Sequence, residues 1–460
     1  MKVAVFGTGY IYEVYKGRIL ADVCCLVDNS LKKQGMLLDG KKVIGPTELV
    51  NYEFSYIVIM TLAHNEIRRQ LIELGVPDKK ILDYTQIDAL AAIYPMVHAK
   101  NEILELKQWF VQNSGKKKIL LVSHDFSYTG VPVLLMNLAM VLKESNCAVL
   151  MTGLEEGNLS KELQENKIDY LERIGTCYGT QWFSESVEKF DHIVVGTLTL
   201  YQFVKKHSET ANHILWWVHE SAPYFYEAVE LPENMHNIQV FGGGNRAVKA
   251  FKKYFPEISI QKLNYCIPDA ADKHEKAASE KLKLGIVGTL CERKAQDVVM
   301  RAIQLLPLQC RNTFECYVVG KESSSEPEYC QCLKNEMNHL EEVQFLGELN
   351  QDQIEDFYQS IDVLLCPSRD DPMPLVVTQA MLYKKTCIIS EDVGQSEYIK
   401  QGVNGFVFKN EDAEELAYCL VRIIEDKECL NQIGEAARQI YQDEFSVEVM
   451  KKNLALHKII

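Results

Sequence analysis

The chain has 460 residues, and its formal net charge of −15 argues against a nucleic-acid binder, which would need a basic face. This length is too great for one compact core, so we expect two or three domains. A local basic patch for a membrane surface would have to come from residues 116–118 or 249–253. The 14 scattered cysteines suit a reduced, cytoplasmic setting, and no apolar run approaches the roughly 20 residues that span a bilayer.

Residues 1–90 are predicted to form a small α/β unit. Its first strand ends in Gly7-Thr-Gly9 and its second at Asp28. A Gly-x-Gly turn with a later acidic residue is typical of dinucleotide binding, but Tyr12 occupies the third fingerprint position. A bound nucleotide and a structural or assembly module therefore both stay open. Residues 91–115 follow as a helical linker, because apolar side chains recur there at helical spacing.

A second strand–turn–helix start opens an α/β unit over residues 116–272. Its first strand leads to Thr129-Gly130, where the glycine lets the backbone approach a ligand at the carboxyl end of a parallel strand. A later buried strand ends at His219. A lone histidine at a strand end is more often structural than catalytic. The turn Gly242-Gly-Gly244 would let a neighbouring backbone come close.

A third α/β unit is predicted over residues 273–440. Its first strand ends at Gly288, and the cations Arg293 and Lys294 follow in the next turn. Because this turn lies between a predicted strand and a predicted helix, both cations are expected at the carboxyl edge of a sheet.

The most informative stretch follows a buried apolar run that ends at Pro367. Pro372 and Pro374 hold the next loop extended, because each proline fixes φ and biases its predecessor away from the helical region. A helix then starts, and its first N–H groups, those of Leu375 and Val376, would face an anion. A carboxylate beside such a cradle suits a ligand with hydroxyls and phosphates, and a sugar nucleotide is such a ligand.

The stretch from Ser368 to Met381 resembles the donor-binding signature of family four of the glycosyltransferases, in which Ser-x-x-Glu and a short loop precede Glu-Ala-Met. Asp371 takes the place of the first glutamate and Gln379 that of the second. Asp371 can still accept hydrogen bonds from sugar hydroxyls, while neutral Gln379 can bond ribose hydroxyls without bringing a charge. Weaker matches follow in the family's order along residues 116–440, and this order is more specific than any single match.

The resemblance implies an α/β chain with the GT-B fold, two Rossmann-like halves, preceded by a third small Rossmann-like domain. The first unit is similar to accessory modules of bacterial surface-polysaccharide enzymes. The expected boundaries are 1–90 for the accessory domain, 91–115 for the linker, 116–272 for the acceptor half, 273–440 for the donor half, and 441–460 for a last helix that crosses back.

Members of the family transfer a sugar from a nucleotide-sugar donor with retention, and they use no essential metal or other cofactor. The resemblance implies that Lys294 and Arg293 hold the donor diphosphate, whose developing charge needs fixed cations in a dry cleft. Thr289 stands where members carry an arginine and Ala295 where they carry a glycine, so Arg293 is expected to supply the missing cation. The loop residues expected to complete the diphosphate site are Met373, Pro374, Leu375 and Val376.

The other site residues follow from the same resemblance. Asp371 is expected to hold the sugar hydroxyls and Gln379 the ribose. Gly130 would close against the donor from the first half. His219 matches the family's Trp-x-His-Glu segment and would flank the donor sugar, with catalysis assigned to His219, Asp371 and Lys294.

The acceptor is expected to be a glycan, a lipid-linked sugar or a protein, in bacterial polysaccharide or glycan assembly at the inner face of the cell membrane or in the cytoplasm. Homo- or hetero-oligomers are compatible with the extra N-terminal unit. One alternative is a non-catalytic partner subunit, favoured by Gln379 and Thr289. A nicotinamide-dependent enzyme is suggested only by Gly7-Thr-Gly9. A phosphorylase would need a lysine for pyridoxal phosphate, to which nothing in the sequence points.

Overall fold

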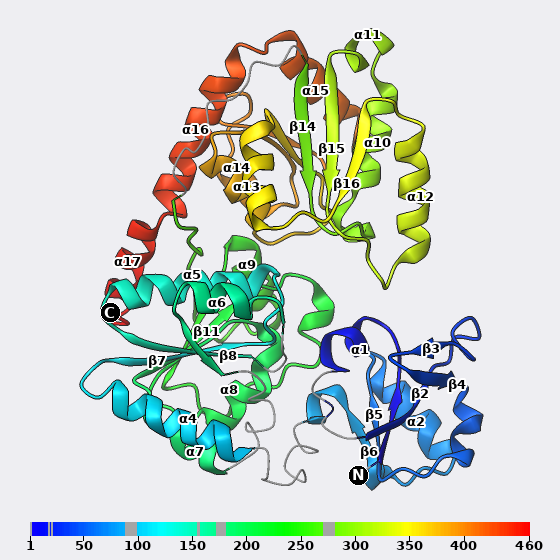
Figure 1. Ribbon diagram of the computed structural model, residues 1–460, viewed down its shortest axis with the longest axis vertical. Coiled ribbons are helices and arrows are strands. Elements are labelled where there is room, and N and C mark those ends of the chain that lie inside the picture. Colours follow the sequence, from blue (N-terminus) through cyan, green and yellow to red (C-terminus); the bar gives the residue numbers. More distant parts are fainter. Residues whose placement is uncertain are drawn as a thin grey trace. The chain divides into compact units, whose positions relative to one another are not determined.

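The structure is a computed structural model that describes residues 2–16, 19, 22–87, 99–153, 157–171, 181–269 and 281–460. Three sheets, parallel apart from one short pair, organise these residues (Figure 1). The α/β class with three Rossmann-like units is thereby confirmed. The expected boundaries near residues 90 and 272 lie outside the described residues and stay predictions. Chain contacts divide the protein into two compact units, Met1–Trp216 with Glu227–Gln239, and Trp217–Tyr226 with Val240–Ile460.

The first sheet has six strands in the order β3-β4-β2-β1-β5-β6. Its central strand β1 is apolar on both faces: Val3 and Val5 enter one core, while Ala4 and Phe6 enter the other. This continuous apolar run is what a parallel strand covered on both sides requires. The elements are β1 (Lys2–Phe6), α1 (Tyr10–Tyr15), β2 (Asp22–Val27), β3 (Leu37–Leu38), β4 (Lys41–Ile44), β5 (Tyr56–Ile59), α2 (His64–Glu73) and β6 (Ile81–Asp83).

The second sheet has seven strands in the order β13-β12-β11-β10-β7-β8-β9. Strand order reverses at β7, so the sheet is doubly wound. Its strands are β7 (Lys118–Ser123), β8 (Ala148–Gly153), β9 (Asp169–Leu171), β10 (His192–Val195), β11 (Ile214–Val218), β12 (Ile238–Gly242) and β13 (Ile260–Lys262). Its helices are α4 (Ala99–Gln112), α5 (Gly130–Glu144), α6 (Ser160–Glu165), α7 (Gln181–Val187), α8 (Tyr201–His207) and α9 (Asn245–Tyr254).

The third sheet repeats this plan with six parallel strands in the order β16-β15-β14-β17-β18-β19. The strands are β14 (Leu282–Val287), β15 (Phe314–Val319), β16 (Val343–Gly347), β17 (Val363–Cys366), β18 (Thr386–Ser390) and β19 (Phe406–Phe408). One face packs against α10 (Gln296–Leu305), α12 (Pro327–Asn338) and α15 (Ala413–Glu425) in a single apolar core. Figure 1 shows α13 (Gln351–Ser360) and α14 (Leu375–Leu382) on the opposite face. The strand order reverses between β14 and β17, which is where open α/β sheets bind ligands.

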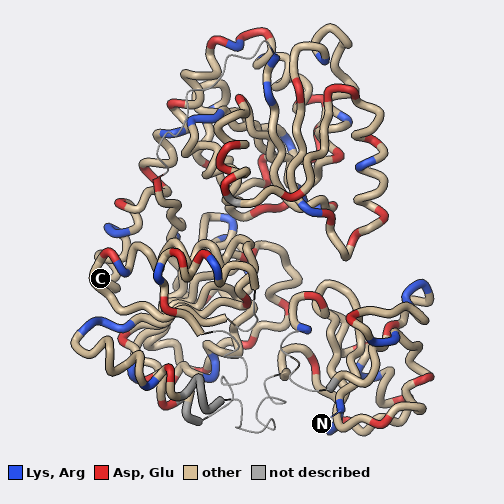
Figure 2. Tube along the Cα trace, in the orientation of Figure 1, with Lys and Arg blue, Asp and Glu red and all other residues tan. Residues whose placement is uncertain are grey.

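The chain ends in α16 (Cys429–Glu444) and α17 (Val447–Leu456). The Tyr441 hydroxyl donates to the carbonyl of Ile267 at 2.9 Å, and the ring of His457 lies 4.6 Å from that of Phe241 on β12. Lys and Arg are interspersed with Asp and Glu along the trace (Figure 2).

Candidate functional site

The candidate site lies in the unit Trp217–Tyr226 with Val240–Ile460, at the carboxyl ends of the adjacent strands β14 and β17. β14 leads into the turn that carries Arg293 and Lys294. β17 leads into the loop that carries Asp371. Because neighbouring parallel strands end at the same edge, the fold alone brings these two predicted segments together.

The cationic turn depends on backbone that L-residues rarely adopt. Gly288 has φ +153°, and the aliphatic part of Lys294 lies over it, with Cδ 3.6 Å from where a Cβ would be. Ala295, where the family carries glycine, is left-handed with φ 55° and fully buried. Such a conformation costs an alanine roughly 1–2 kcal/mol. An alanine therefore holds a left-handed position in this turn that a glycine would occupy without strain.

Both cations converge on Asp371. Nζ of Lys294 lies 2.5 Å and a guanidinium nitrogen of Arg293 3.3 Å from the same carboxylate oxygen. Arg293 also donates to the carbonyl of Asp370 at 2.9 Å. Burial would raise the pKa of Asp371, but the two cations outweigh it and hold the pKa below its ordinary value. Asp371 is therefore a buried, ionised carboxylate.

The loop of Asp371 is fixed by the segment that follows β18. The N–H of Asp371 donates to the carbonyl of Asp392 at 3.2 Å, and the N–H of Gly394 donates to the carbonyl of Asp371 at 2.9 Å. A Cβ on Gly394 would lie 1.6 Å from the carbonyl oxygen of Pro372. Only glycine fits there without moving the loop.

The start of α14 is positioned by a buried polar trio that sequence reasoning did not single out. The Gln395 amide donates to the carbonyl of Pro374 at 2.8 Å and to the hydroxyl of Thr378 at 3.0 Å. The hydroxyls of Tyr265 and Thr378 lie 2.8 Å apart. All three side chains are almost fully buried. The sequence signal that could have marked this segment is Gly394, directly before Gln395.

The first turn of α14 bears the predicted amides of Leu375 and Val376. Within the described chain, no side chain caps this helix start. Its first-turn N–H groups therefore point out of the helix without a side-chain cap, as an anion site requires. Gln379 lies further along the same helix and is partly buried.

His219 follows β11, and the glycine turn after β12 touches it. A Cβ on Gly243 would lie 2.2 Å from Nδ1 of His219, and one on Gly244 would lie 2.4 Å from Cε of Met373. The backbone of Pro372 also comes close, with its carbonyl oxygen 3.4 Å from a Cβ on Gly244, so this turn adjoins a neighbouring backbone as well as two side chains. Through this turn, His219 and the Met373 loop pack against adjacent glycines.

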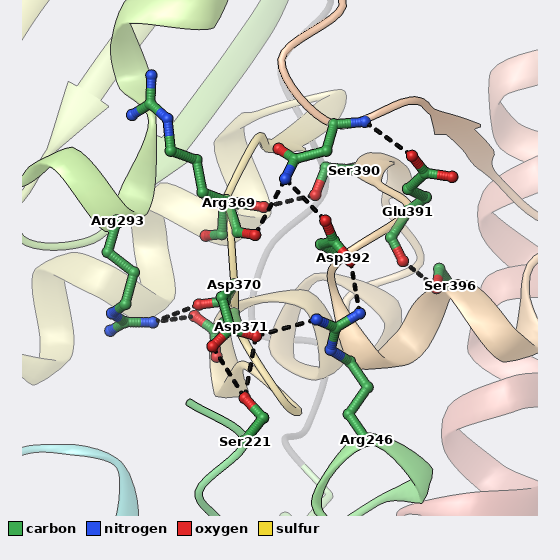
Figure 3. A network of polar contacts seen from close by, with 12 residues as sticks. Ser221, Arg246, Arg293, Arg369, Asp370, Asp371, Ser390, Glu391, Asp392 and Ser396 are labelled. Atoms are coloured by element: carbon green, nitrogen blue, oxygen red, sulfur yellow. Dashed lines mark hydrogen bonds and ion pairs between the residues drawn. The ribbon is translucent and has the colours of Figure 1, made fainter. Parts of the chain in front are cut away.

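This unit also contains a group of charged residues whose pairing the sequence did not predict (Figure 3). Arg246 pairs with Asp370 at 3.0 Å and with Asp392 at 2.7 Å. The hydroxyl of Ser221 donates to the Asp370 carboxylate at 2.9 Å. These residues come from α9, the β17 loop, the β18 loop and the segment after β11, so no local sequence pattern links them.

Gly130 belongs to the other compact unit, where it begins α5. A Cβ added to Gly130 would meet nothing within 4 Å. Its predicted role against the donor stays a prediction.

In the first sheet, the Gly7-Thr-Gly9 turn is hydrogen-bonded to Asp28, the acidic residue at the end of the second strand. Asp28 accepts from the N–H and hydroxyl of Thr8 at 3.0 and 2.5 Å and from the N–H of Ser30 at 2.8 Å. Burial would raise the pKa of Asp28, but these donors and nearby Lys33 lower it. The acid that would bind a cofactor ribose is thus already bonded within the turn.

Two features are absent from the residues that the structure describes. None of their helices is long and apolar enough to cross a membrane. They also contain no group of three His, Cys, Asp or Glu side chains placed to hold a metal ion.

Comparisons with known proteins agree with this arrangement. Residues 269–440 match the family "Glycosyl transferases group 1", and residues 115–255 match "Glycosyl-transferase family 4". Residues 1–82 match "C2185-like, N-terminal".

Solved structures share the fold. HepE of Anabaena, in complex with UDP and glucose, superposes with a TM-score of 0.62 at 18% identity, over 74% of this chain and 99% of that one. The apo form of WaaB, a lipopolysaccharide outer core galactosyltransferase, gives 0.54 at 15% identity, over 75% of this chain and all of the other. At these identities the likeness shows the fold alone.

Among curated proteins, the D-inositol 3-phosphate glycosyltransferase of Streptomyces griseus is 27% identical over 156 residues, which is 33% of each chain. The chain spans less than half the length of this relative and of others it matches. Fold and matches define a GT-B protein of two Rossmann-like halves. Within that class, the chain belongs to the glycosyl transferases group 1 of family 4 and carries a C2185-like N-terminal domain.

Proposed function

We propose that the protein is a retaining glycosyltransferase that moves a hexosyl or related sugar from a nucleotide-sugar donor without an essential metal. The observation that carries this is the convergence of Lys294 and Arg293 on Asp371 beside the start of α14. Two cations and a row of amides suit a diphosphate, and the carboxylate between them suits sugar hydroxyls.

In the proposed complex, the donor diphosphate binds Lys294, Arg293 and the first-turn amides of α14. Asp371 then accepts hydrogen bonds from the sugar, and Gln379 from further along α14 bonds the ribose. As the bond between the anomeric carbon and the diphosphate breaks, negative charge grows on the leaving phosphate. Fixed cations and the positive end of a helix stabilise that charge. His219 would flank the sugar, and the role against the donor that the sequence predicts for Gly130 is part of the proposal.

A uridine diphosphate sugar is the donor we propose first, because HepE binds UDP and UDP-glucose. A glycan, a lipid-linked sugar or a protein is the acceptor we propose. Assembly of bacterial surface polysaccharide or glycan is the setting, supported by the likeness to a lipopolysaccharide galactosyltransferase.

The test offers the purified protein UDP-, GDP- and dTDP-sugars and measures binding by calorimetry and nucleotide release by a coupled assay. We expect one nucleotide class to bind and to be released faster when an acceptor is present. The anomeric configuration of the product, read by NMR, should match that of the donor. Turnover should survive EDTA. If no nucleotide sugar binds, the proposal is wrong.

A second candidate is a non-catalytic subunit that stabilises another glycosyltransferase. Gln379 and Thr289 favour it, because each replaces a charged residue of the family. The same assay separates the two, since this candidate would form a stable complex with a partner enzyme while releasing no nucleotide.

A further inference from the structure

Arg246 joins two loops that both reach Asp371. It lies in the first turn of α9, and its guanidinium spans the carboxylates of Asp370 at 3.0 Å and Asp392 at 2.7 Å (Figure 3). The Arg246 side chain is only 30% exposed. Nη1 of the guanidinium donates to Asp392 and Nη2 donates to Asp370, so one positive charge serves both acids.

The two carboxylates flank the backbone of Asp371. Asp370 is its direct neighbour in the chain, and the carbonyl of Asp392 accepts the Asp371 N–H at 3.2 Å. Neutral donors hold the same carboxylates. Ser221 donates to Asp370 at 2.9 Å and Asn410 to Asp392 at 2.7 Å. Among the ion pairs of the described residues, however, Arg246 is the only cation that pairs with the carboxylates of Asp370 and Asp392.

The balance of charge explains why this matters. The carboxylates of Asp370, Asp371 and Asp392 are paired with three cations, Arg246, Arg293 and Lys294. Without Arg246, two uncompensated acids would stand beside the place where a diphosphate has to bind. Partly buried charges are screened less than exposed ones, so this repulsion would reach the ligand.

We propose that Arg246 is a positioning residue that keeps this site receptive to a nucleoside diphosphate, by neutralising Asp370 and Asp392 and tying their loops around Asp371. The inference rests on the proposed function. Arg246 does not touch the donor in this scheme. It acts through the two acids on either side of Asp371.

The experiment titrates UDP and UDP-glucose into wild type, Arg246→Gln and Arg246→Lys by calorimetry, at low and at high salt. Arg246→Gln loses the charge and should bind UDP about tenfold more weakly, with a smaller deficit at high salt. Arg246→Lys keeps the charge and should stay within about threefold of wild type. Equal weakness of the two variants would show that only shape matters and would overturn the proposal.

A double-mutant cycle with Asp370→Asn isolates the charge. In the Arg246→Gln background, Asp370→Asn removes one of the two uncompensated acids and should recover part of the lost UDP affinity, so its effect there should be more favourable than its effect in the wild-type background. A cycle without coupling would overturn the inference even where Arg246→Gln binds weakly. Arg68→Ala is the matched control, because Arg68 pairs with Asp78 at 2.8 Å in the other compact unit.

The outcome also separates the two proposals. If wild type binds no nucleotide or nucleotide sugar, the proposed function falls and this inference falls with it. If wild type binds and Arg246→Gln binds equally well at low salt, only the inference is wrong. Melting temperatures of all variants show whether a loss of binding reflects a loss of fold.

Discussion

Nζ of Lys294 lies 2.5 Å from Oδ2 of Asp371, so a cation of the candidate diphosphate site is paired with the site's own carboxylate. Arg293 lies 3.3 Å from the same oxygen. An arriving diphosphate therefore competes with Asp371 for both cations, and its binding would release the carboxylate toward the sugar. This competition gives the two partners opposite expected effects on nucleotide affinity.

Asp371→Asn should strengthen UDP binding and weaken sugar transfer. The amide has nearly the same shape but no charge, so Lys294 and Arg293 become available to phosphate, and we expect UDP affinity to rise roughly three- to tenfold. Sugar hydroxyls lose a charged acceptor worth about 1.5–3 kcal/mol, so transfer should fall about ten- to a hundredfold. Calorimetry with UDP and turnover with UDP-sugar measure both. Unchanged turnover in the folded variant would contradict the role of Asp371.

Lys294→Ala should weaken UDP binding, in contrast to Asp371→Asn. It removes the nearer of the two cations and leaves the buried Asp371 carboxylate with only half-exposed Arg293 as an ion-pair partner within the described residues. We expect UDP affinity to fall about a hundredfold, as for loss of a charged partner in a partly dry site. Lys205→Ala is the control, because Lys205 pairs with Glu230 at 2.5 Å in the other compact unit. UDP binding by Lys294→Ala at wild-type strength would speak against a diphosphate at this place.

The sequence predicts those parts of the site whose residues lie close together in the chain and share one local pattern. Asp371 and the start of α14 follow from a strand, two prolines and a helix. Lys294 and Arg293 follow from a strand and its turn, and the strand order confirmed that both turns share one edge. Arg246 could not be found in this way, because it meets Asp370 and Asp392 from 124 and 146 residues away. Pairings over such separations depend on how whole sheets are connected, which no local period encodes.

The same limit applies to the buried polar residues. Gln395 reads as an ordinary polar residue in a turn, yet it is fully buried and bonds the carbonyl that begins α14. A buried amide needs such partners, but the sequence does not show that Gln395 is buried.

Gly394→Ala should damage the site without touching a charge. The added Cβ would meet the carbonyl oxygen of Pro372 at 1.6 Å, so the loop of Asp371 must shift. Because a displacement of about 1 Å can cost a hundredfold in rate, we expect turnover to fall by about that factor. Gly9→Ala is the matched control, since a Cβ on Gly9 meets nothing within 4 Å. Turnover and the melting temperature should be measured on both. Full activity of Gly394→Ala would mean that the loop tolerates the shift.

Acid should destabilise the protein through His207, which is fully buried against Phe203 and Phe183, with ring centroids 4.6 and 5.9 Å away. Burial, aided by the neighbouring Lys206, lowers the pKa of His207 from 6.5 to about 3. Between these pH values the unfolded chain binds a proton that the folded protein does not. The free energy of unfolding should therefore fall as pH drops below about 6.5, by up to about 1.4 kcal/mol per pH unit.

Melting temperatures recorded from pH 7 to pH 4 test this prediction. The fall of the melting temperature in acid, here called the acid limb, should be shallower for His207→Leu than for wild type. His236→Leu, which replaces an exposed histidine, should follow wild type. Identical acid limbs for wild type and His207→Leu would show that other groups govern the loss, because removing the imidazole removes the proton uptake on which this prediction depends.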